Sequence, residues 1–343
     1  MPNHTDTLTN NLDWQVKLNE PIDLASFHSL DIPEMDWVVS DMFAVSQSGL
    51  LTSSTGKGKS LNAQMLSICI ATGKPFGSFF VPKPRKTLYL DGEMHPKEFQ
   101  DRERRCSWIT DRDWEKLTQN LFYWSKLYGK NFPDLSDEKT WERLISFCMK
   151  EKIEVLIVDN YFSMTRMKDY NAPQEAQKLQ DLFIDPLKAF GISILMVDHL
   201  NKSGTEYGTL VKQAGVEFIL RISYDKESQL FTMASQKGRT LGMGQKDMVY
   251  RITTDGNEVV ALDMESAKTL SEQKAIEKNK IGNKFKELYE DGYNKSQTLR
   301  DAMEAYKKDA DIDKLLFKFD SLRNEIPLWI ADMGFETELL KNQ

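Results

Sequence analysis

The chain has 343 residues with 45 basic and 52 acidic side chains, and its net charge of −7 excludes a strongly basic footprint for nucleic acid, so any such site must be local. The length allows one large domain with a smaller appendage, because single cores rarely exceed about 250 residues. Three widely spaced cysteines exclude a disulfide framework, and the lack of a signal-peptide pattern or a membrane-length apolar run predicts a cytoplasmic protein without a membrane partner.

Residues 1–36 are polar and acidic with scattered aromatic side chains, and we predict a short arm or a cap on the main domain. From residue 37 to residue 263, strand-like runs alternate with helical stretches. This alternation is typical of an α/β domain with a mostly parallel central sheet and helices on both faces.

The segment from Ser53 to Ser60 has the composition of a phosphate-binding loop. A buried strand end precedes it at 49–52, and apolar residues follow it at helical spacing up to a capping glycine at 73. In such a loop, backbone amides and a helix N-terminus hold phosphate, while a lysine reaches the β and γ phosphates and a hydroxyl binds Mg²⁺. The residues predicted to bind the nucleotide are Ser54, Thr55, Gly56, Lys57, Gly58, Lys59 and Ser60, and the alternative is a surface turn of similar composition.

Three buried strands are predicted after the loop, at 87–91, 155–159 and 192–197, and a polar residue suited to hydrolysis lies at or just after the end of each. Glu93 is our candidate for the base that orients the attacking water, although a strand-to-helix turn carries acids as well. Asp159 is expected to support Mg²⁺ together with Ser60. His199 is our candidate γ-phosphate sensor, with a solvent-facing loop histidine as the alternative.

Two helices are predicted between these strands, one from Ser136 to Lys150 and one over 174–190. Strand-like runs at 216–224 and 229–235 predict an antiparallel hairpin, and a further strand is expected at 248–253. Residues 264–283 are charged and predict a linker or exposed helix, and residues 284–343 predict a small C-terminal helical domain.

A pair of cations follows the hairpin, in the sequence Lys237-Gly238-Arg239. Because side chains alternate along an extended segment, Lys237 and Arg239 are expected to share one side of it. Two cations in this arrangement could complete the phosphate site of a neighbouring subunit. The alternative is an ordinary basic turn with exposed side chains.

This order of motifs, from Trp37 to Gly242, resembles the RecA-like hexameric replicative helicases, in particular the RepA type found on plasmids and other mobile elements. The resemblance implies a RecA-like P-loop ATPase core, ATP and Mg²⁺ as ligands, and a homo-oligomer, most simply a hexamer. It assigns catalytic roles to Glu93 and His199, and to Lys237 with Arg239 as a finger acting in trans. The chain departs from the family at Ser53, where a glycine or alanine is usual, and at Asp198, where a second histidine is common.

The resemblance further implies that loops following Asp159 and His199 line a central channel for single-stranded DNA. Basic side chains there would track phosphates and an aromatic ring could stack on a base. The residues in question are Arg166, Lys168, Lys202, Tyr207 and Lys212. The C-terminal unit could recruit a primase or a replication initiator.

The leading hypothesis is therefore an ATP-dependent, ring-forming helicase or translocase on single-stranded DNA, acting in the replication of a plasmid, phage or other mobile element. An oligomeric RecA-like ATPase in regulation, recombination or defence, without unwinding activity, is the main alternative, because a motor core does not specify its task. Two further hypotheses are a monomeric P-loop kinase and a binding module with a degenerate loop.

Overall fold

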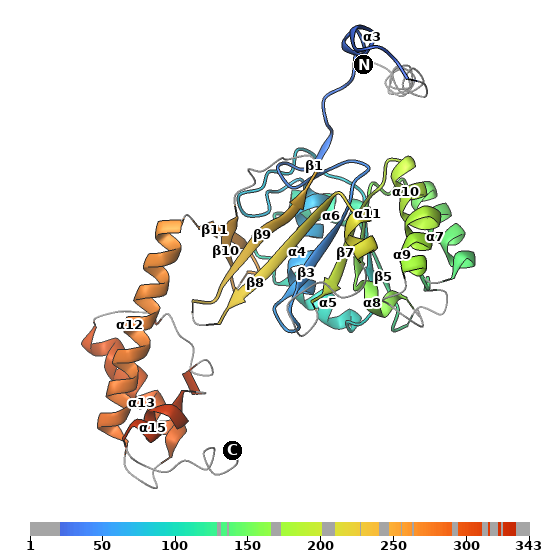
Figure 1. The fold of residues 1–343 in the computed structure, drawn as a ribbon. Coiled ribbons are helices and arrows are strands. Elements are labelled where there is room, and N and C mark those ends of the chain that lie inside the picture. Colours follow the sequence, from blue (N-terminus) through green and yellow to red (C-terminus); the bar gives the residue numbers. More distant parts are fainter. Residues whose placement is uncertain are drawn as a thin grey trace.

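A nine-stranded sheet forms the centre of the protein (Figure 1). Its parallel part contains, in spatial order, β8 (Phe218–Asp225), β3 (Ser48–Ser53), β7 (Ser193–His199), β6 (Val155–Asp159), β4 (Thr87–Asp91) and β5 (Leu121–Ser125). Beyond β8 the sheet continues with three antiparallel strands, β9 (Leu230–Gly238), β10 (Met248–Ile252) and β11 (Val259–Leu262). The predicted α/β core with a mostly parallel sheet is thus confirmed.

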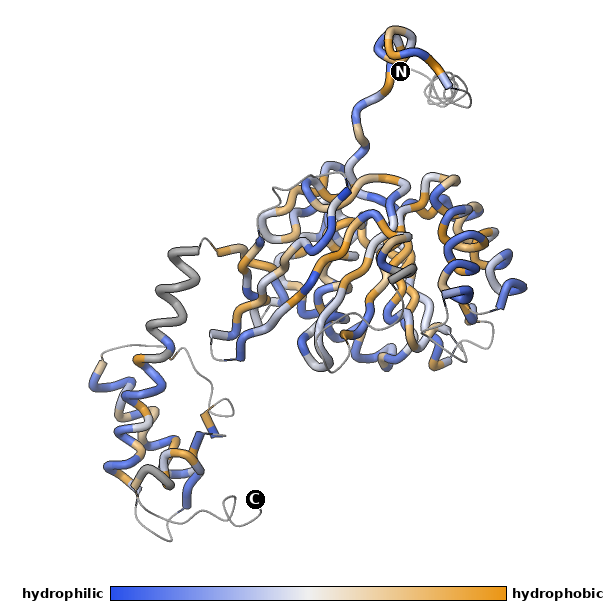
Figure 2. Tube along the Cα trace, viewed as in Figure 1, coloured by the Kyte–Doolittle hydropathy of each residue, from blue (hydrophilic) through white to orange (hydrophobic). Residues whose placement is uncertain are grey.

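The computed structural model describes residues 21–128, 132–135, 137–165, 173–200, 210–226, 228–239, 247–254, 256–262, 264–289, 294–310, 315, 322–323 and 325–333. In this part of the chain, hydrophobic residues concentrate in the central strands (Figure 2). No helix in these ranges is long and apolar enough to cross a membrane.

Helices cover both faces of the sheet and enclose two hydrophobic cores. One face carries α4 (Lys59–Thr72), α5 (Pro96–Arg104) and α6 (Asp111–Asn120). The other carries α7 (Glu138–Glu151), α8 (Tyr161–Met164), α9 (Pro173–Leu179), the π-helical segment η1 (Gln180–Ile184), α10 (Asp185–Ala189) and α11 (Leu210–Gly215). Successive strand residues point to opposite faces, so Leu51 of β3 packs in the first core and Leu50 in the second.

The predicted strands at 87–91, 155–159 and 192–197 form as β4, β6 and β7, and the predicted hairpin forms as β8 and β9. The helix expected from Ser136 begins at Glu138, with Asp137 as its N-cap accepting a hydrogen bond from the Lys139 amide. The helical stretch expected at 174–190 consists of α9, η1 and α10 in succession. Strand β5 had not been predicted, because its half-buried edge position leaves no clear alternation in the sequence.

The ends of the described chain lie outside these layers (Figure 1). Helix α3 (Leu24–His28) precedes an extended segment that reaches β1 (Trp37–Val39) and β2 (Phe43–Ala44), a separate antiparallel pair. After the sheet, α12 (Met264–Leu288), α13 (Lys295–Asp309) and α15 (Ile326–Asp332) form a third hydrophobic core. The residues predicted as a linker or exposed helix, 264–283, therefore lie within a helix that runs on into this core.

Gly49 of β3 allows the ring of Phe218 on β8 to lie directly against the backbone. A Cβ added at Gly49 would lie 2.2 Å from that ring, which also stacks on Phe43 with the centroids 4.9 Å apart. We predict that Gly49→Ala lowers the free energy of unfolding by about 1–3 kcal/mol, because an overpacked core must shift. Urea unfolding followed by tryptophan fluorescence measures this.

The double variant Gly49→Ala with Phe218→Leu provides the control, since the smaller side chain makes room for the added methyl group. Its loss of stability should be smaller than the sum of the two single losses. Strictly additive losses would contradict a steric conflict between these two residues.

Candidate active site

The predicted phosphate-binding loop joins the carboxyl end of β3 to the N-terminus of α4. Gly56 and Gly58 adopt φ angles of +73° and +78°, which side chains with a Cβ rarely adopt. Helix α4 follows β3 on one face of the sheet, whereas α11, the next described element after the neighbouring β7, lies with α9 on the other face. The loop therefore lies where open α/β sheets bind ligands, outside the carboxyl ends of the strands at a switch in connection.

Lys59 is only 5% exposed and its ammonium is held in the loop. Its Nζ donates hydrogen bonds to the carbonyls of Ser53 at 2.9 Å and Ser54 at 3.1 Å. Burial lowers the pKa of Lys59, and three carboxylates oppose this shift through their charge, namely Asp159, Asp198 and Glu93. Lys59 therefore interacts electrostatically with Asp159 and Glu93, the two carboxylates predicted to take part in ATP hydrolysis.

Asp159 ends β6, and its carboxylate is 4% exposed beside the start of α4. Oδ1 accepts a hydrogen bond from the Ser60 hydroxyl at 3.2 Å, and Oδ2 accepts one from the Tyr89 hydroxyl at 2.5 Å. Burial raises the pKa of Asp159 to about 6, and the two hydroxyl donors act against that shift. Ser60 and Asp159 are therefore in direct contact, as a shared role at Mg²⁺ requires.

The turn after β4 is organised by Asp91, a buried residue that had not been predicted to belong to the site. Its Oδ1 accepts hydrogen bonds from the amides of Glu93 at 3.0 Å and Met94 at 2.8 Å, and its Oδ2 accepts one from the Tyr123 hydroxyl at 2.7 Å. Glu93 itself is exposed, and its charge acts on Lys59 and Asp159. This arrangement suits a carboxylate that must meet water.

His199 ends β7 and is half-buried next to the strand that carries Asp159. Its Nε2 lies 3.2 Å from Nδ2 of Asn160, the residue that follows Asp159. The neighbouring Asp198 is 2% exposed, and its Oδ1 accepts a hydrogen bond from the His199 amide at 2.9 Å. The predicted sensor and the predicted metal support are thus linked through a single side chain, Asn160.

Lys237 and Arg239 lie at the opposite edge of the sheet from the phosphate-binding loop of the same chain. Strand β9 runs antiparallel, so Lys237 pairs with Ile219, which is level with Leu50 in the middle of β3. The Arg239 amide donates to the carbonyl of Glu217, whose own amide donates to the carbonyl of Ser48 at the start of β3. Both cations donate to the carbonyl of Ala214, at 3.3 Å from Lys237 and 2.6 Å from Arg239. They share one side of the strand end, and the structure does not bring them to the loop within one chain.

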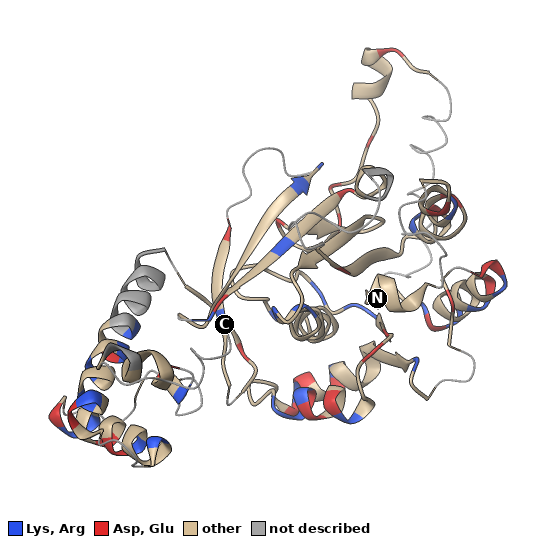
Figure 3. Cartoon of the chain, turned by 60° about the horizontal axis from the view of Figure 1, so that its bottom comes forward, with Lys and Arg blue, Asp and Glu red and all other residues tan. Residues whose placement is uncertain are grey.

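The residues predicted to contact DNA fall largely outside the described part of the chain. Four of them lie outside it entirely, namely Arg166, Lys168, Lys202 and Tyr207. For Lys212 only the backbone is described, as part of α11. In Figure 3, Lys and Arg are interspersed with Asp and Glu along the peripheral helices, so the charges drawn there do not separate into a basic and an acidic side.

A metal ion at this site would be held in the manner of P-loop enzymes. Within the described ranges, no group of three or more His, Cys, Asp or Glu side chains could form a metal cage by itself. A P-loop Mg²⁺ needs only a hydroxyl, a carboxylate and oxygens of the bound phosphates. Ser60 and Asp159 supply the hydroxyl and the carboxylate, so the residues present fit the ion.

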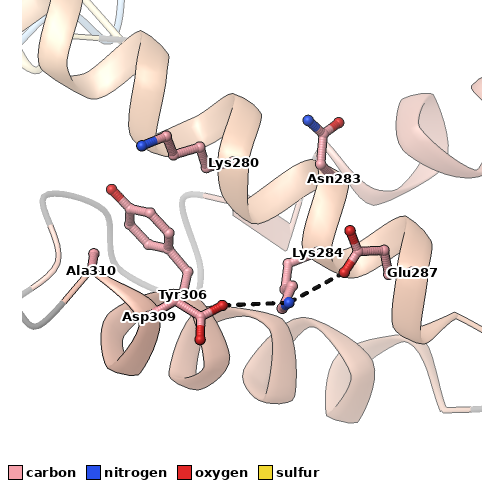
Figure 4. A pocket seen from close by; sticks show the side chains of 7 residues that line it. All are labelled: Lys280, Asn283, Lys284, Glu287, Tyr306, Asp309 and Ala310. Atoms are coloured by element: carbon pink, nitrogen blue, oxygen red, sulfur yellow. Dashed lines mark ion pairs between the residues drawn. The ribbon is translucent and has the colours of Figure 1, made fainter.

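A separate hollow lies between α12 and α13 in the C-terminal unit (Figure 4). Lys284 is its central charge, and its Nζ pairs with Glu287 at 3.2 Å and with Asp309 at 3.4 Å. These ion pairs lie on the helices of the third core, outside the strand edge that carries the phosphate-binding loop.

The strand order from β8 through β3, β7 and β6 to β4, with the loop after β3, defines a RecA-like P-loop ATPase. The family described as "AAA domain" matches residues 17–205, more than half of the 343 residues. The chain belongs to this family.

Two solved structures resemble the fold. A KaiC-like protein from the archaeon Pyrococcus horikoshii OT3 is 14% identical with a TM-score of 0.49, covering 68% of this chain and 96% of its own. The flagellar accessory protein FlaH from Methanocaldococcus jannaschii is 12% identical with a TM-score of 0.45, covering 64% and 90% respectively. Among curated proteins, none matches this sequence.

The hydrogen bond from Tyr89 to Asp159 gives a prediction about pH. It favours the ionised carboxylate, so Tyr89→Phe should raise the pKa of Asp159 and leave it protonated over a wider acidic range. We expect the acidic limb of kcat/KM for ATP turnover to move upward by about one pH unit. A profile from pH 5 to 8 on both proteins measures the shift.

Tyr123→Phe is the matched control, because it removes a hydroxyl that donates to Asp91 instead. The midpoint of the acidic limb of its kcat/KM profile should equal that of the unmodified protein. If both variants shift alike, the Tyr89 hydroxyl has no specific effect on Asp159.

Proposed function

We propose that this protein is an ATP-driven translocase or helicase that assembles as a ring, most simply a hexamer, around single-stranded DNA. The observation that carries this proposal is the contact between Asn160 and His199, 3.2 Å apart at the edge that holds the phosphate-binding loop. The two segments predicted to contact DNA follow these residues in the sequence, one after Thr165 and the other after Leu200. A change at the nucleotide thus has a short route to both segments.

In the hydrolytic step, Lys59 and the loop amides hold the phosphates, and Glu93 orients and deprotonates the attacking water. Mg²⁺, when bound, would neutralise charge on the phosphate oxygens. Asp91 and Tyr123 keep Glu93 in place through the turn after β4. His199 then senses the loss of the γ-phosphate and passes the change to Asn160.

The positions of Lys237 and Arg239 support a site shared between subunits. Within one chain they lie near the start of β3, whereas the phosphate-binding loop lies at its end. A neighbouring copy that presents this edge to the loop would add two cations to the developing negative charge. In this proposal each ATP lies between two copies, and the C-terminal helical unit is available for a primase or initiator.

A mixing experiment tests the shared site. Lys59→Ala and Arg239→Ala subunits should each be inactive alone, because one lacks the phosphate lysine and the other the finger. Mixed at equal amounts, they should recover up to about a quarter of the normal ATP turnover, the share of interfaces at which an intact loop meets an intact finger.

A mixture of Lys59→Ala with Glu93→Gln is the control, since both defects fall on the same side of every interface and no recovery is expected. Absence of recovery in both mixtures would contradict the proposal that Arg239 acts on the ATP site of a neighbouring subunit. Normal turnover by Lys59→Ala alone would remove the ATPase site from the loop altogether.

DNA dependence separates the proposal from a regulatory ATPase without unwinding activity. Single-stranded DNA should stimulate ATP turnover, and its apparent affinity should fall by about tenfold or more between about 50 and 200 mM salt. Arg166→Ala with Lys168→Ala should flatten this salt dependence, whereas Lys150→Ala on the exposed side of α7 should not. A strand-displacement assay on the same proteins reports unwinding, and indifference to DNA would favour the regulatory ATPase.

A further inference from the structure

Three aromatic side chains form a row across neighbouring strands beside the phosphate-binding loop. Tyr224 of β8 lies 4.7 Å from Phe231 of β9 between ring centroids, and Phe231 stacks on Tyr250 of β10 at 5.4 Å. Phe231 is 7% exposed and Tyr250 is fully buried, whereas Tyr224 is half-buried. Tyr224 is thus the most exposed member of the row.

The row is fixed to the start of α4 by hydrogen bonds. The Tyr250 hydroxyl donates to Oδ1 of Asn62 at 2.5 Å, and Nδ2 of Asn62 donates to the Gly58 carbonyl at 2.9 Å. The Phe231 ring lies so close to the loop that a Cβ on Gly58 would be 3.0 Å from it. The aromatic row and the loop therefore keep a fixed spacing.

A direct contact also joins the loop to the outer member of the row. Lys57 donates from its Nζ to the backbone carbonyl of Tyr224 at 3.2 Å. Strand β8 pairs with β3 up to Thr52 and then continues to Asp225, past the point where β3 gives way to the loop. Tyr224 consequently lies alongside the loop.

The catalytic groups indicate which way a nucleotide would lie. Glu93 follows β4, and Asp159 and His199 are the last residues of β6 and β7. These three strands are all on one side of β3 in the sheet, and β8 is on the other side. A triphosphate with its terminal phosphate among these three groups leaves its nucleoside free to extend toward β8. There the half-buried tyrosine offers an aromatic surface next to the phosphates.

We propose that Tyr224 is the platform on which the base of the bound nucleotide stacks. This inference rests on the proposed ATPase site and adds to it the element that recognises the nucleoside. Stacking uses the face of the base, which all nucleobases possess, so the platform would favour nucleotides over bare polyphosphates and discriminate little between adenine and guanine. Its hydroxyl is not required for this role.

The test compares two probes, ATP and inorganic tripolyphosphate, each titrated with Mg²⁺ into the full-length protein by calorimetry. Tyr224→Leu should weaken ATP binding by about 5- to 150-fold, the range for loss of one stacked base, and leave tripolyphosphate binding unchanged. Tyr224→Phe should bind ATP normally, because the ring is retained. Tyr306→Leu, which alters a partly buried tyrosine in the C-terminal unit, is the matched control and should affect neither probe.

Each outcome decides a separate point. Equal loss of both probes in Tyr224→Leu would show that the side chain only supports the loop, and unchanged ATP affinity would show that the base does not touch it; either result overturns the platform. If the unmodified protein binds neither probe, or Lys59→Ala binds both as well as the unmodified protein does, the proposed ATPase site itself fails, independently of Tyr224.

Discussion

The geometry of the site depends on the hydrogen bonds that the buried carboxylate of Asp159 accepts. Strands β3 and β6 are not neighbours, because β7 lies between them, so backbone pairing alone does not fix the distance from the loop to β6. The Ser60 and Tyr89 hydroxyls bridge that gap by donating to the two oxygens of one buried carboxylate. A buried charge without such partners would be costly, so burial and hydrogen bonding hold the loop, β4 and β6 together.

Strand direction decides at which end of the sheet's strands each functional group lies. The parallel strands deliver Asp159, His199 and the turn of Glu93 to their carboxyl edge, because they all run the same way. Strand β9 runs the other way, so Lys237 near its end and Arg239 just after it lie toward the amino ends of the parallel strands. One change of strand direction thus places the two cations toward the opposite end of the strands from the phosphate-binding loop.

Much of the fold was predictable because its signals are local. The loop is recognisable from eight consecutive residues, Ser53 to Ser60, and β4, β6 and β7 from short apolar runs. The pairing of Asp159 with Ser60 was predicted, but its hydrogen bond with Tyr89 was not predictable, because that contact depends on strand register. In this register Asp91 is opposite Asp159 and Tyr89 is opposite Ile157. The same holds for Asp91 and Tyr123, which read as ordinary strand residues until β5 is known to lie beside β4.

A contact between α12 and the β8–β9 turn ties the C-terminal unit to the sheet. Lys274 is 6% exposed and donates from its Nζ to the Ser228 carbonyl at 2.5 Å, in the turn that follows Tyr224 by four residues. From Lys274 the helix continues to Leu288, a length of about 21 Å at 1.5 Å per residue. Lys274 lies near the middle of α12, and the residues after it pack in the third core, so a displacement of the turn would be passed along the helix to that core.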